Sequence, residues 1–327
     1  MYLENLKFSL WADFIEREYL EHEFKELIEK RVINGATSNP AIFKSAILSS
    51  PAYKEQLASL DKKLSAKEKY EALAIFDIQK AADVLAPLHK KGDDGYVSIE
   101  VDPFLCDDAE ATIAEGKRLF QAIGRENVMI KVPATQAGYI AMEELTAAGI
   151  AVNATLIFKK EQALACVAAF KRGMSRASKS VDTVISIFVS RVDRAIDAIL
   201  KEKGVATALT GVYNSSAIYE AIEAQKLPRC RALFASTGVK DNSLPPYYYV
   251  EKLLAYNTVN TAPVDTIKAF DKDAKKEVQL PIENEVVVAH MQKLADVGID
   301  LEALLDGQIV DGLEAFKEAF KEILEAL

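Results

Sequence analysis

The chain alternates short apolar segments, typical of β-strands, with longer segments whose apolar residues recur every three or four positions, as in amphipathic helices. We count about eight such pairs. The strand-like segments are residues 6–13, 32–39, 96–103, 127–134, 149–158, 182–190, 230–237 and 257–263. Strands that are joined by helices pair in parallel, because each helix carries the chain back over the sheet. A number close to eight predicts an α/β fold of the closed (β/α)8 type, the TIM barrel.

An open doubly wound sheet is the alternative for this alternation. The strand–helix junctions carry neither GxGxxG nor GxxxxGK[S/T], the glycine-rich phosphate loops of nucleotide-binding sheets. No low-complexity stretch or linker divides the chain. We therefore expect one barrel domain over residues 1–327, with a helical insertion around residues 45–65. The C-terminal helices, over residues 283–327, should pack on the barrel.

Charge and composition exclude several classes of partner and site. The net charge of −9 disfavours binding to nucleic acid or to an anionic membrane surface. No apolar run approaches the roughly 20 residues of a membrane span, and the N-terminus does not resemble a signal peptide. The three cysteines have no CxxC spacing, which suits a reducing, cytoplasmic compartment. The three histidines lie outside the strand-like segments, so we expect no metal site.

Polar residues gather near the carboxyl ends of the expected strands. These residues are Asp13, Thr37, Asn39, Glu100, Lys131, Asn153, Thr155, Ser186 and Ser236. In a (β/α)8 barrel those ends converge on one mouth, where active sites are built. A barrel packed only for stability would carry Val, Ile and Leu at such positions. The pattern therefore predicts a site for a small molecule.

Lys131 lies inside the otherwise apolar segment "NVMIKVPAT". Strand alternation places it on one face with Met129, and places Glu100 on the corresponding face of the preceding strand. If both faces point inward, the two side chains can meet. A lysine without water becomes a nucleophilic amine toward carbonyl carbons. A carboxylate at Glu100 would oppose formation of the neutral amine, because it favours the ammonium form of Lys131. Glu100 could also relay protons during the reaction. A purely structural ion pair is the alternative.

Several of these residues also have ordinary structural explanations. Asp13 could cap the following helical segment. Asn39 precedes Pro40, a usual start of a helix. Arg191 opens a helical segment, where a solvated arginine is common, although an anion could use the N-terminus of that helix. Local sequence leaves these alternatives open.

Six segments, in this order, resemble the transaldolases. They are "ATSNPAIF" (36–43), "SIEVDP" (98–103), "MIKVPAT" (129–135), "VNATLIF" (152–158), "ISIFVSRVD" (185–193) and "ASTGVK" (235–240). The last is similar to the branch of the family with an ASTGxK motif. The resemblance implies a barrel enzyme of the class I, Schiff-base-forming aldolases that needs no cofactor. Such an enzyme moves a dihydroxyacetone unit from sedoheptulose 7-phosphate or fructose 6-phosphate to glyceraldehyde 3-phosphate or erythrose 4-phosphate, within the pentose phosphate pathway.

The resemblance also implies roles for individual residues. Lys131 would form the imine, Asp13 would act as acid and base, and Glu100 with Thr155 would hold a water molecule. The residues expected to bind the sugar phosphate are Asn39, Thr37, Asn153, Ser186, Phe188, Arg191, Ser236 and Lys240. Several relatives have a second arginine soon after the serine that corresponds to Ser236, and this chain has Lys240 in that stretch instead. We expect small sugar phosphates as partners and a monomer or homodimer.

Two rival functions remain. Fructose 6-phosphate aldolase is a smaller relative that releases free dihydroxyacetone, and it tends to carry a tyrosine where this chain has Phe188. The length of the chain and Phe188 both speak against it. A non-catalytic sugar-phosphate-binding barrel is the other rival. Every carried-over catalytic position is occupied by a suitable residue, which favours an enzyme.

Overall fold

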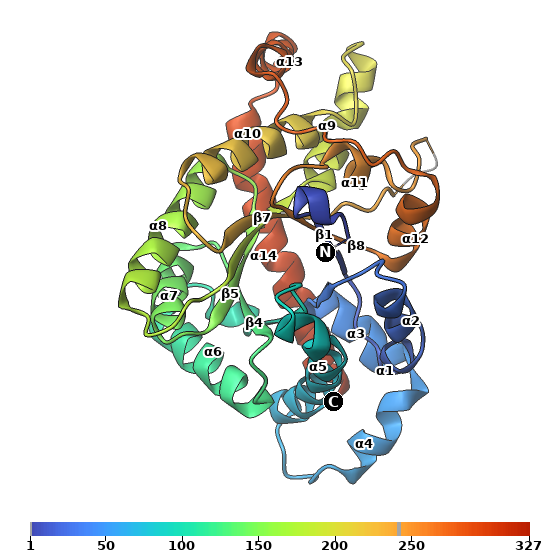
Figure 1. The fold of residues 1–327 in the computed structure, drawn as a ribbon, viewed down its shortest axis with the longest axis vertical. Coiled ribbons are helices and arrows are strands. Elements are labelled where there is room, and N and C mark those ends of the chain that lie inside the picture. Colours follow the sequence, from blue (N-terminus) through green and yellow to red (C-terminus); the bar gives the residue numbers. More distant parts are fainter. Residues whose placement is uncertain (1, 241–242) are drawn as a thin grey trace.

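The computed structural model describes residues 2–240 and 243–327 and shows eight parallel strands closed into a barrel, in the order of the chain (Figure 1). The strands are β1 (Ser9–Ala12), β2 (Gly35–Thr37), β3 (Tyr96–Glu100), β4 (Val128–Pro133), β5 (Ala151–Ile157), β6 (Thr183–Phe188), β7 (Cys230–Ala235) and β8 (Val259–Ala262). Each lies within one of the eight expected segments. β8 pairs with β1 and closes the ring. The predicted (β/α)8 barrel is confirmed.

Helices surround the barrel (Figure 1). They are α1 (Arg17–Glu21), α2 (Glu23–Glu29), α3 (Pro40–Ser49), α4 (Lys54–Ser59), α5 (Ala66–Lys90), α6 (Ala109–Ile123), α7 (Gln136–Ala147), α8 (Lys160–Arg176), α9 (Ser190–Glu202), α10 (Thr210–Ala224), α11 (Tyr248–Lys252), α12 (Val264–Asp273), α13 (Asn284–Asp296) and α14 (Leu301–Ala326). Among the described residues, no helix has both the length and the apolar composition that a membrane span requires.

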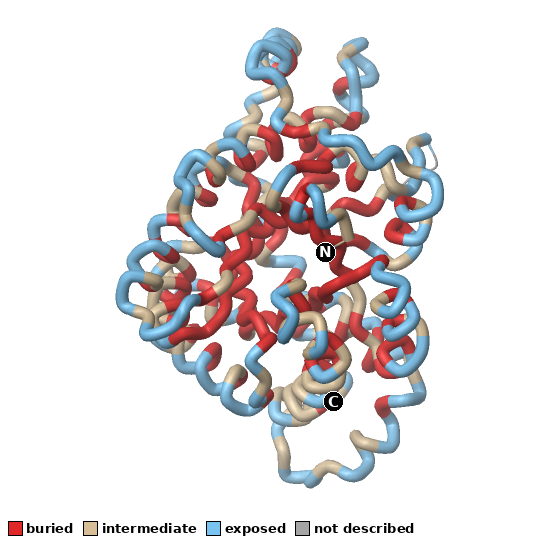
Figure 2. The backbone as a smooth tube through the Cα atoms, in the orientation of Figure 1, coloured by how far each residue is buried: buried red, intermediate tan, exposed pale blue. Residues whose placement is uncertain are grey.

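Strand alternation places the buried residues of the strands in two hydrophobic clusters. Ile130 and Val132 of β4 pack in the cluster between the strands and the outer helices. Met129 of the same strand packs with Trp11 in a second cluster inside the barrel. Figure 2 shows the strands as the most buried part of the chain, with exposed segments around the rim. The odd-numbered residues of β4, including Lys131, therefore face the barrel interior, as the alternation predicted.

The end of the barrel at which the strands begin is closed by packing and by buried polar bonds. The indole of Trp11 fills the interior so closely that a Cβ atom on Gly35 would lie 2.6 Å from it, so only glycine fits there. Trp11 Nε1 donates to Asp94 Oδ2 at 3.1 Å. Arg231 Nη2 donates to the other oxygen of Asp94 at 2.6 Å. This leaves the opposite end, where the strands finish, as the mouth.

The C-terminal helix α14 lies over that mouth. It packs against α3, α5 and α9, and its residues Ala315 and Phe316 face the barrel opening. Leu156, in a bulge of β5 with φ of 60°, reaches toward this helix. A Cβ atom on Gly312 would lie 2.9 Å from its Cδ2, so the helix approaches closely. The expected insertion around residues 45–65 consists of the end of α3, a 3-10 turn and α4. The single-domain division itself stays a prediction.

A buried carboxylate joins α9 to α10 beside the mouth. Asp193, which is fully buried, accepts a hydrogen bond from the backbone N–H of Gly211 at 2.8 Å. Burial raises the pKa of its carboxyl to about 7, against the partial opposition of the backbone bond. The folded protein therefore holds a proton on Asp193 that the unfolded chain releases near pH 4.

We expect the free energy of unfolding to fall between about pH 4 and pH 7 because of Asp193. The sign follows from the raised pKa, since the folded state binds the extra proton in this window. Asp193→Asn keeps an oxygen for Gly211 and cannot ionise. It should therefore be more stable than the wild type at pH 8, by up to about 4 kcal/mol, and close to it at pH 4, where the unfolded chain also begins to hold the proton. Denaturant unfolding at both pH values measures the difference. A constant difference between the two variants would contradict the assignment.

Candidate active site

A cavity of about 260 Å³ opens at the mouth of the barrel, and we call it the mouth cavity. The expected site residues that line it are Asp13, Thr37, Asn39, Lys131, Ser186, Phe188, Arg191, Ser236 and Lys240. They come from the ends of five strands and from the segments that follow them. Barrel closure therefore brings together residues that are more than 200 positions apart in the sequence.

The amine of Lys131 lies in the dry inner part of this cavity. The residue is 5% exposed. Its Nζ donates to the carbonyl oxygen of Ser38 at 3.1 Å and lies 3.4 Å from Glu100 Oε2. The ring of Phe316 from α14 lies 5.9 Å away on the mouth side. The amine is thus shielded from bulk water while it still borders the cavity.

Glu100 is held in register beside Lys131, because the two residues are paired across β3 and β4. Burial raises the pKa of its carboxyl to about 7, although the positive charge of Lys131 acts in the other direction. Among the described residues, neither carboxyl oxygen has a hydrogen-bonding partner. The 3.4 Å contact with Lys131 is also longer than the roughly 2.8 Å of a charge-assisted hydrogen bond. Glu100 can therefore gain or lose a proton near neutral pH.

Asp13 follows β1 and lies on the wall of the mouth cavity. Thr37 Oγ1 donates to its Oδ1 at 2.7 Å, and the hydroxyl of Thr261 lies 2.6 Å from that of Thr37. Burial raises the pKa of Asp13, while Lys131 and the Thr37 bond act against the rise. Asp13 does not cap the next helix, since Glu16 caps α1 through the N–H of Tyr19. The capping alternative for Asp13 is wrong.

Asn39 combines both of its expected roles. Its Oδ1 caps α3 by accepting from the N–H of Ile42 at 3.0 Å, with Pro40 at the first helical position. The same side chain borders the mouth cavity. Because the cap uses the oxygen, the amide N–H groups are the part that can serve a ligand.

Two expected residues of β5 lie below the mouth cavity and do not form part of its lining in the described chain. The amide of Asn153 is held from two sides: Ser186 Oγ donates to its Oδ1 at 2.6 Å, and its Nδ2 donates to Ser98 Oγ at 3.1 Å. Thr155 is fully buried, and its hydroxyl has no hydrogen-bonding partner among the described residues. Thr155 thus resembles Glu100, which also lies outside the lining.

Positive charge gathers at the outer end of the mouth cavity. The guanidinium of Arg191, in the first turn of α9, stacks on Phe188 at 5.2 Å. Burial and the nearby Arg194 lower its pKa. Ser236 follows β7 in the left-handed backbone region, with φ of 55°, and its hydroxyl lies 3.1 Å from that of Ser190. Lys240 is exposed and lies at the rim.

Of the lining residues that the sequence did not predict, three have a polar or aromatic side chain: Arg194, Thr261 and Phe316. Arg194 lies three positions after Arg191 on α9, and this spacing places both on one helix face. Thr261 is a polar residue near the end of β8, so the rule that selected the other strand-end residues could have found it. Phe316 gives no local signal, because its role depends on the path of α14 across the mouth.

The arrangement suits chemistry on a carbonyl group of an anionic small molecule. A shielded amine can add to a carbonyl carbon, two carboxyl groups can move protons, and several cations can hold an anion. Among the described residues, no group of three or more His, Cys, Asp or Glu side chains is placed to hold a metal ion.

Comparison with known proteins assigns the family. Residues 10–327 match the model of the transaldolase/fructose-6-phosphate aldolase family. A transaldolase of Campylobacter jejuni (strain RM1221) is 46% identical over 98% of this chain and 99% of its own length. A transaldolase of Helicobacter pylori (strain Shi470) is 43% identical over 98% of this chain and 99% of its own length. The chain therefore belongs to the transaldolase/fructose-6-phosphate aldolase family.

Proposed function

We propose that this enzyme is a transaldolase that transfers a dihydroxyacetone unit between sugar phosphates through an imine on Lys131. The observation that carries the proposal is the shielded amine of Lys131, which lies 3.4 Å from the Glu100 carboxyl and borders the same cavity as Asp13. Cleavage of a carbon–carbon bond needs a group that accepts the electron pair, and a protonated imine on Lys131 would be that group.

Imine formation would begin with attack of the neutral Lys131 amine on the C2 carbonyl of a ketose phosphate. The carbinolamine hydroxyl then takes a proton and leaves as water, which gives the protonated imine. Glu100, with a pKa of about 7, can supply that proton and take it back on hydrolysis. The buried, unpartnered oxygens of Glu100 and Thr155 support a shared water site for this step.

Carbon–carbon cleavage would follow from Asp13. Its carboxylate takes the proton of the C4 hydroxyl, the C3–C4 bond breaks, and the electron pair moves into the imine to form a neutral enamine. The aldose phosphate leaves. Addition to a second aldose phosphate reverses these steps, and Asp13 returns the proton to the new hydroxyl. Thr37, hydrogen-bonded to Asp13 at 2.7 Å, orients the carboxyl for both directions.

The substrate would lie with its dihydroxyacetone part inside and its phosphate outside. Asn39 and Ser186 border the inner part of the mouth cavity, and Asn153 holds Ser186 from below. Arg191, Ser236 and Lys240 at the outer end would bind the phosphate, and Arg194 adds a cation that the sequence interpretation missed. Local cations are needed here, because the net charge of −9 repels anions.

Transfer is favoured over simple cleavage to free dihydroxyacetone. Phe188 borders the mouth cavity beside Arg191, and a phenyl ring cannot donate a proton or order a water molecule as a phenol can. The curated relatives named above carry the name transaldolase. A place in the pentose phosphate pathway follows from this activity. The three cysteines are free and buried, which supports a cytoplasmic location.

We expect borohydride to trap a covalent adduct at Lys131 when fructose 6-phosphate is present, because borohydride reduces an imine to a stable amine. Peptide mass mapping of the reduced protein locates the adduct. Lys131→Arg keeps a positive charge but cannot form the imine, so it should abolish both adduct and turnover. Full-length wild type without borohydride serves as the control. Tight binding of the sugar phosphate without any adduct would instead indicate a binding protein.

Asp13→Asn should slow turnover by about 10²–10⁴-fold, the usual contribution of a general acid–base group. The amide keeps the size of the side chain but cannot take the C4 hydroxyl proton. Borohydride trapping at Lys131 should persist in this variant, since imine formation precedes cleavage. Stopped-flow measurement of aldose release separates the two steps. A mild loss in turnover would show that another group is the acid and base.

Lys240→Ala and Arg194→Ala should each raise the KM for phosphorylated sugars, acceptors included, by about 10-fold, because each removes one cation beside the phosphate. Lys201→Ala is the matched control, since Lys201 lines the adjoining cavity but not the mouth cavity. Steady-state kinetics with glyceraldehyde 3-phosphate and with glyceraldehyde as acceptors tests the assignment. Equal losses toward both acceptors would remove these residues from the phosphate site.

A further inference from the structure

A second, much smaller space lies beside Glu100 and shares no lining residue with the mouth cavity. We call this space, enclosed by β3, α5, α6 and α14, the rear hollow. Its volume is about 10 Å³, which is enough for about one water molecule. Glu100 and Tyr70 both line it, whereas Lys131 lines the mouth cavity. The carboxyl of Glu100 therefore separates the reacting amine from the rear hollow.

Tyr70 of α5 is the neutral hydrogen-bond donor of the rear hollow. The residue is 7% exposed. Its ring is held edge-on by Phe320 at 5.1 Å and by Phe43 at 5.9 Å. Burial raises the pKa of its hydroxyl, and the negative charge of Glu100 adds to this, followed by those of Glu71, Glu115 and Asp102. The phenol therefore keeps its proton and faces carboxylates.

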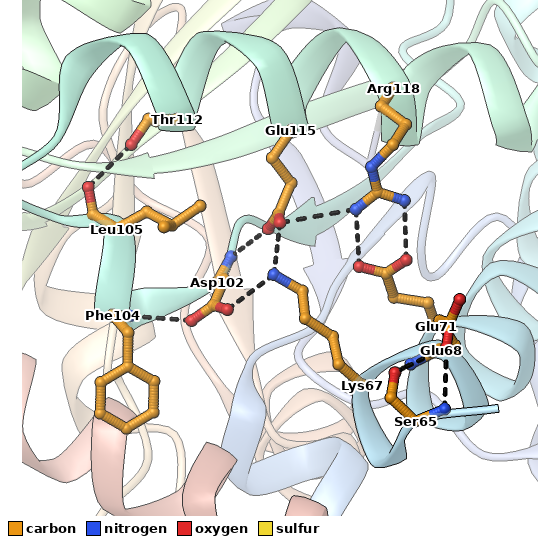
Figure 3. Close-up of polar contacts among 10 residues, drawn as sticks. All are labelled: Ser65, Lys67, Glu68, Glu71, Asp102, Phe104, Leu105, Thr112, Glu115 and Arg118. Atoms are coloured by element: carbon orange, nitrogen blue, oxygen red, sulfur yellow. Dashed lines mark hydrogen bonds and ion pairs between the residues drawn. The ribbon is translucent and has the colours of Figure 1, made fainter. Parts of the chain in front are cut away.

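Three charged residues that line the rear hollow form an ion cluster, whose contacts Figure 3 shows. Lys67 Nζ contacts Asp102 Oδ2 at 2.7 Å and Glu115 Oε2 at 2.6 Å. The other oxygen of Glu115 accepts from the backbone N–H of Asp102 at 2.6 Å. The Lys67 side chain is 33% exposed, whereas its two partners are 10% and 8% exposed. The ions of this cluster pair with one another, and the carboxyl oxygens of Glu100 have no hydrogen-bonding partner among the described residues.

We propose that Tyr70 is a positioning residue for imine formation and hydrolysis, acting on Glu100 through one water molecule in the rear hollow. The inference rests on the proposed function. The Tyr70 hydroxyl donates to the water, and the water donates to a carboxyl oxygen of Glu100. The carboxyl is then fixed with its other oxygen toward Lys131. Glu100 still gives one proton to the leaving carbinolamine hydroxyl and recovers one proton on hydrolysis, so the relay itself consumes none.

The groups that face Glu100 determine how a pH profile is interpreted. They are Lys131 on β4, Asp13 after β1, Arg191 on α9, Tyr70, Lys67 and Glu71 on α5, Asp102 after β3 and Glu115 on α6. α14 contributes the rings of Phe316 and Phe320, which do not titrate. Tyr70→Phe removes one hydroxyl and changes no charge. A shift in this variant therefore reports the lost hydrogen bond.

Tyr70→Phe should slow borohydride trapping at Lys131 by about 10-fold with saturating fructose 6-phosphate, the effect of losing one hydrogen bond to a charged group. The KM should stay within about two-fold, so the loss appears in kcat. The apparent pKa of the rate profile near pH 7 should rise by about half a unit to one unit. A hydrogen-bond donor lowers the pKa of a carboxyl, and this variant loses that donor. Unchanged trapping and an unchanged apparent pKa would overturn the proposal.

Tyr139→Phe is the matched control, since it removes a phenol from α7, away from both spaces. It should leave the trapping rate and the apparent pKa of the rate profile as in the wild type. Thermal unfolding of both variants verifies that each is folded. A raised KM with normal trapping in Tyr70→Phe would mean a merely structural tyrosine and overturn the proposal. Failure of the wild type to form any adduct would overturn the proposed function as well, which keeps the two failures distinguishable.

Discussion

A lysine and a glutamate share the water-poor interior of the barrel, and the rest of the site is arranged around that pair. Burial of two charges is costly unless each finds compensating partners. Here the contact between Lys131 and Glu100 is loose, at 3.4 Å, and the glutamate has a pKa of about 7. A looser pair stabilises the fold less, but it leaves the carboxyl oxygens of Glu100 open to a further partner. The parallel register of β3 and β4 fixes their relative position, so this chemistry depends directly on closure of the sheet.

Each layer around the pair performs a distinct physical task. The outer faces of the strands carry aliphatic residues that pack against helices, and this cluster holds the barrel together. The inner faces carry the apolar side chains of Trp11 and Met129, and they are polar where the strands end. α14 then places Phe316 over the amine. Low dielectric at Lys131 thus results from the barrel wall and from a helix that follows the last strand by about 40 residues.

The sequence was sufficient for the barrel, for the eight strands and for the inward direction of Glu100 and Lys131, because these follow from two-residue alternation and from repeat number. It was also sufficient for most residues of the mouth cavity, since strand ends converge. Local pattern could not decide between capping and binding at Asn39, which does both. It could not reveal Phe316 or Tyr70 either. Their positions depend on helix packing across the barrel end, and no spacing within one helix encodes that packing. Asn153 lies deeper than expected for the same reason: its amide is taken up by Ser98 and Ser186.

The plug of Trp11, Asp94 and Arg231 closes one end of the barrel, and the rear hollow admits nothing larger than water. Among the described residues, Lys131 borders one cavity, the mouth cavity, so the arriving and departing sugar phosphates of the proposed reaction would share this opening. In that reaction, the first aldose phosphate would leave before the second one enters. A double-displacement order of this kind would follow from the shape of the mouth cavity.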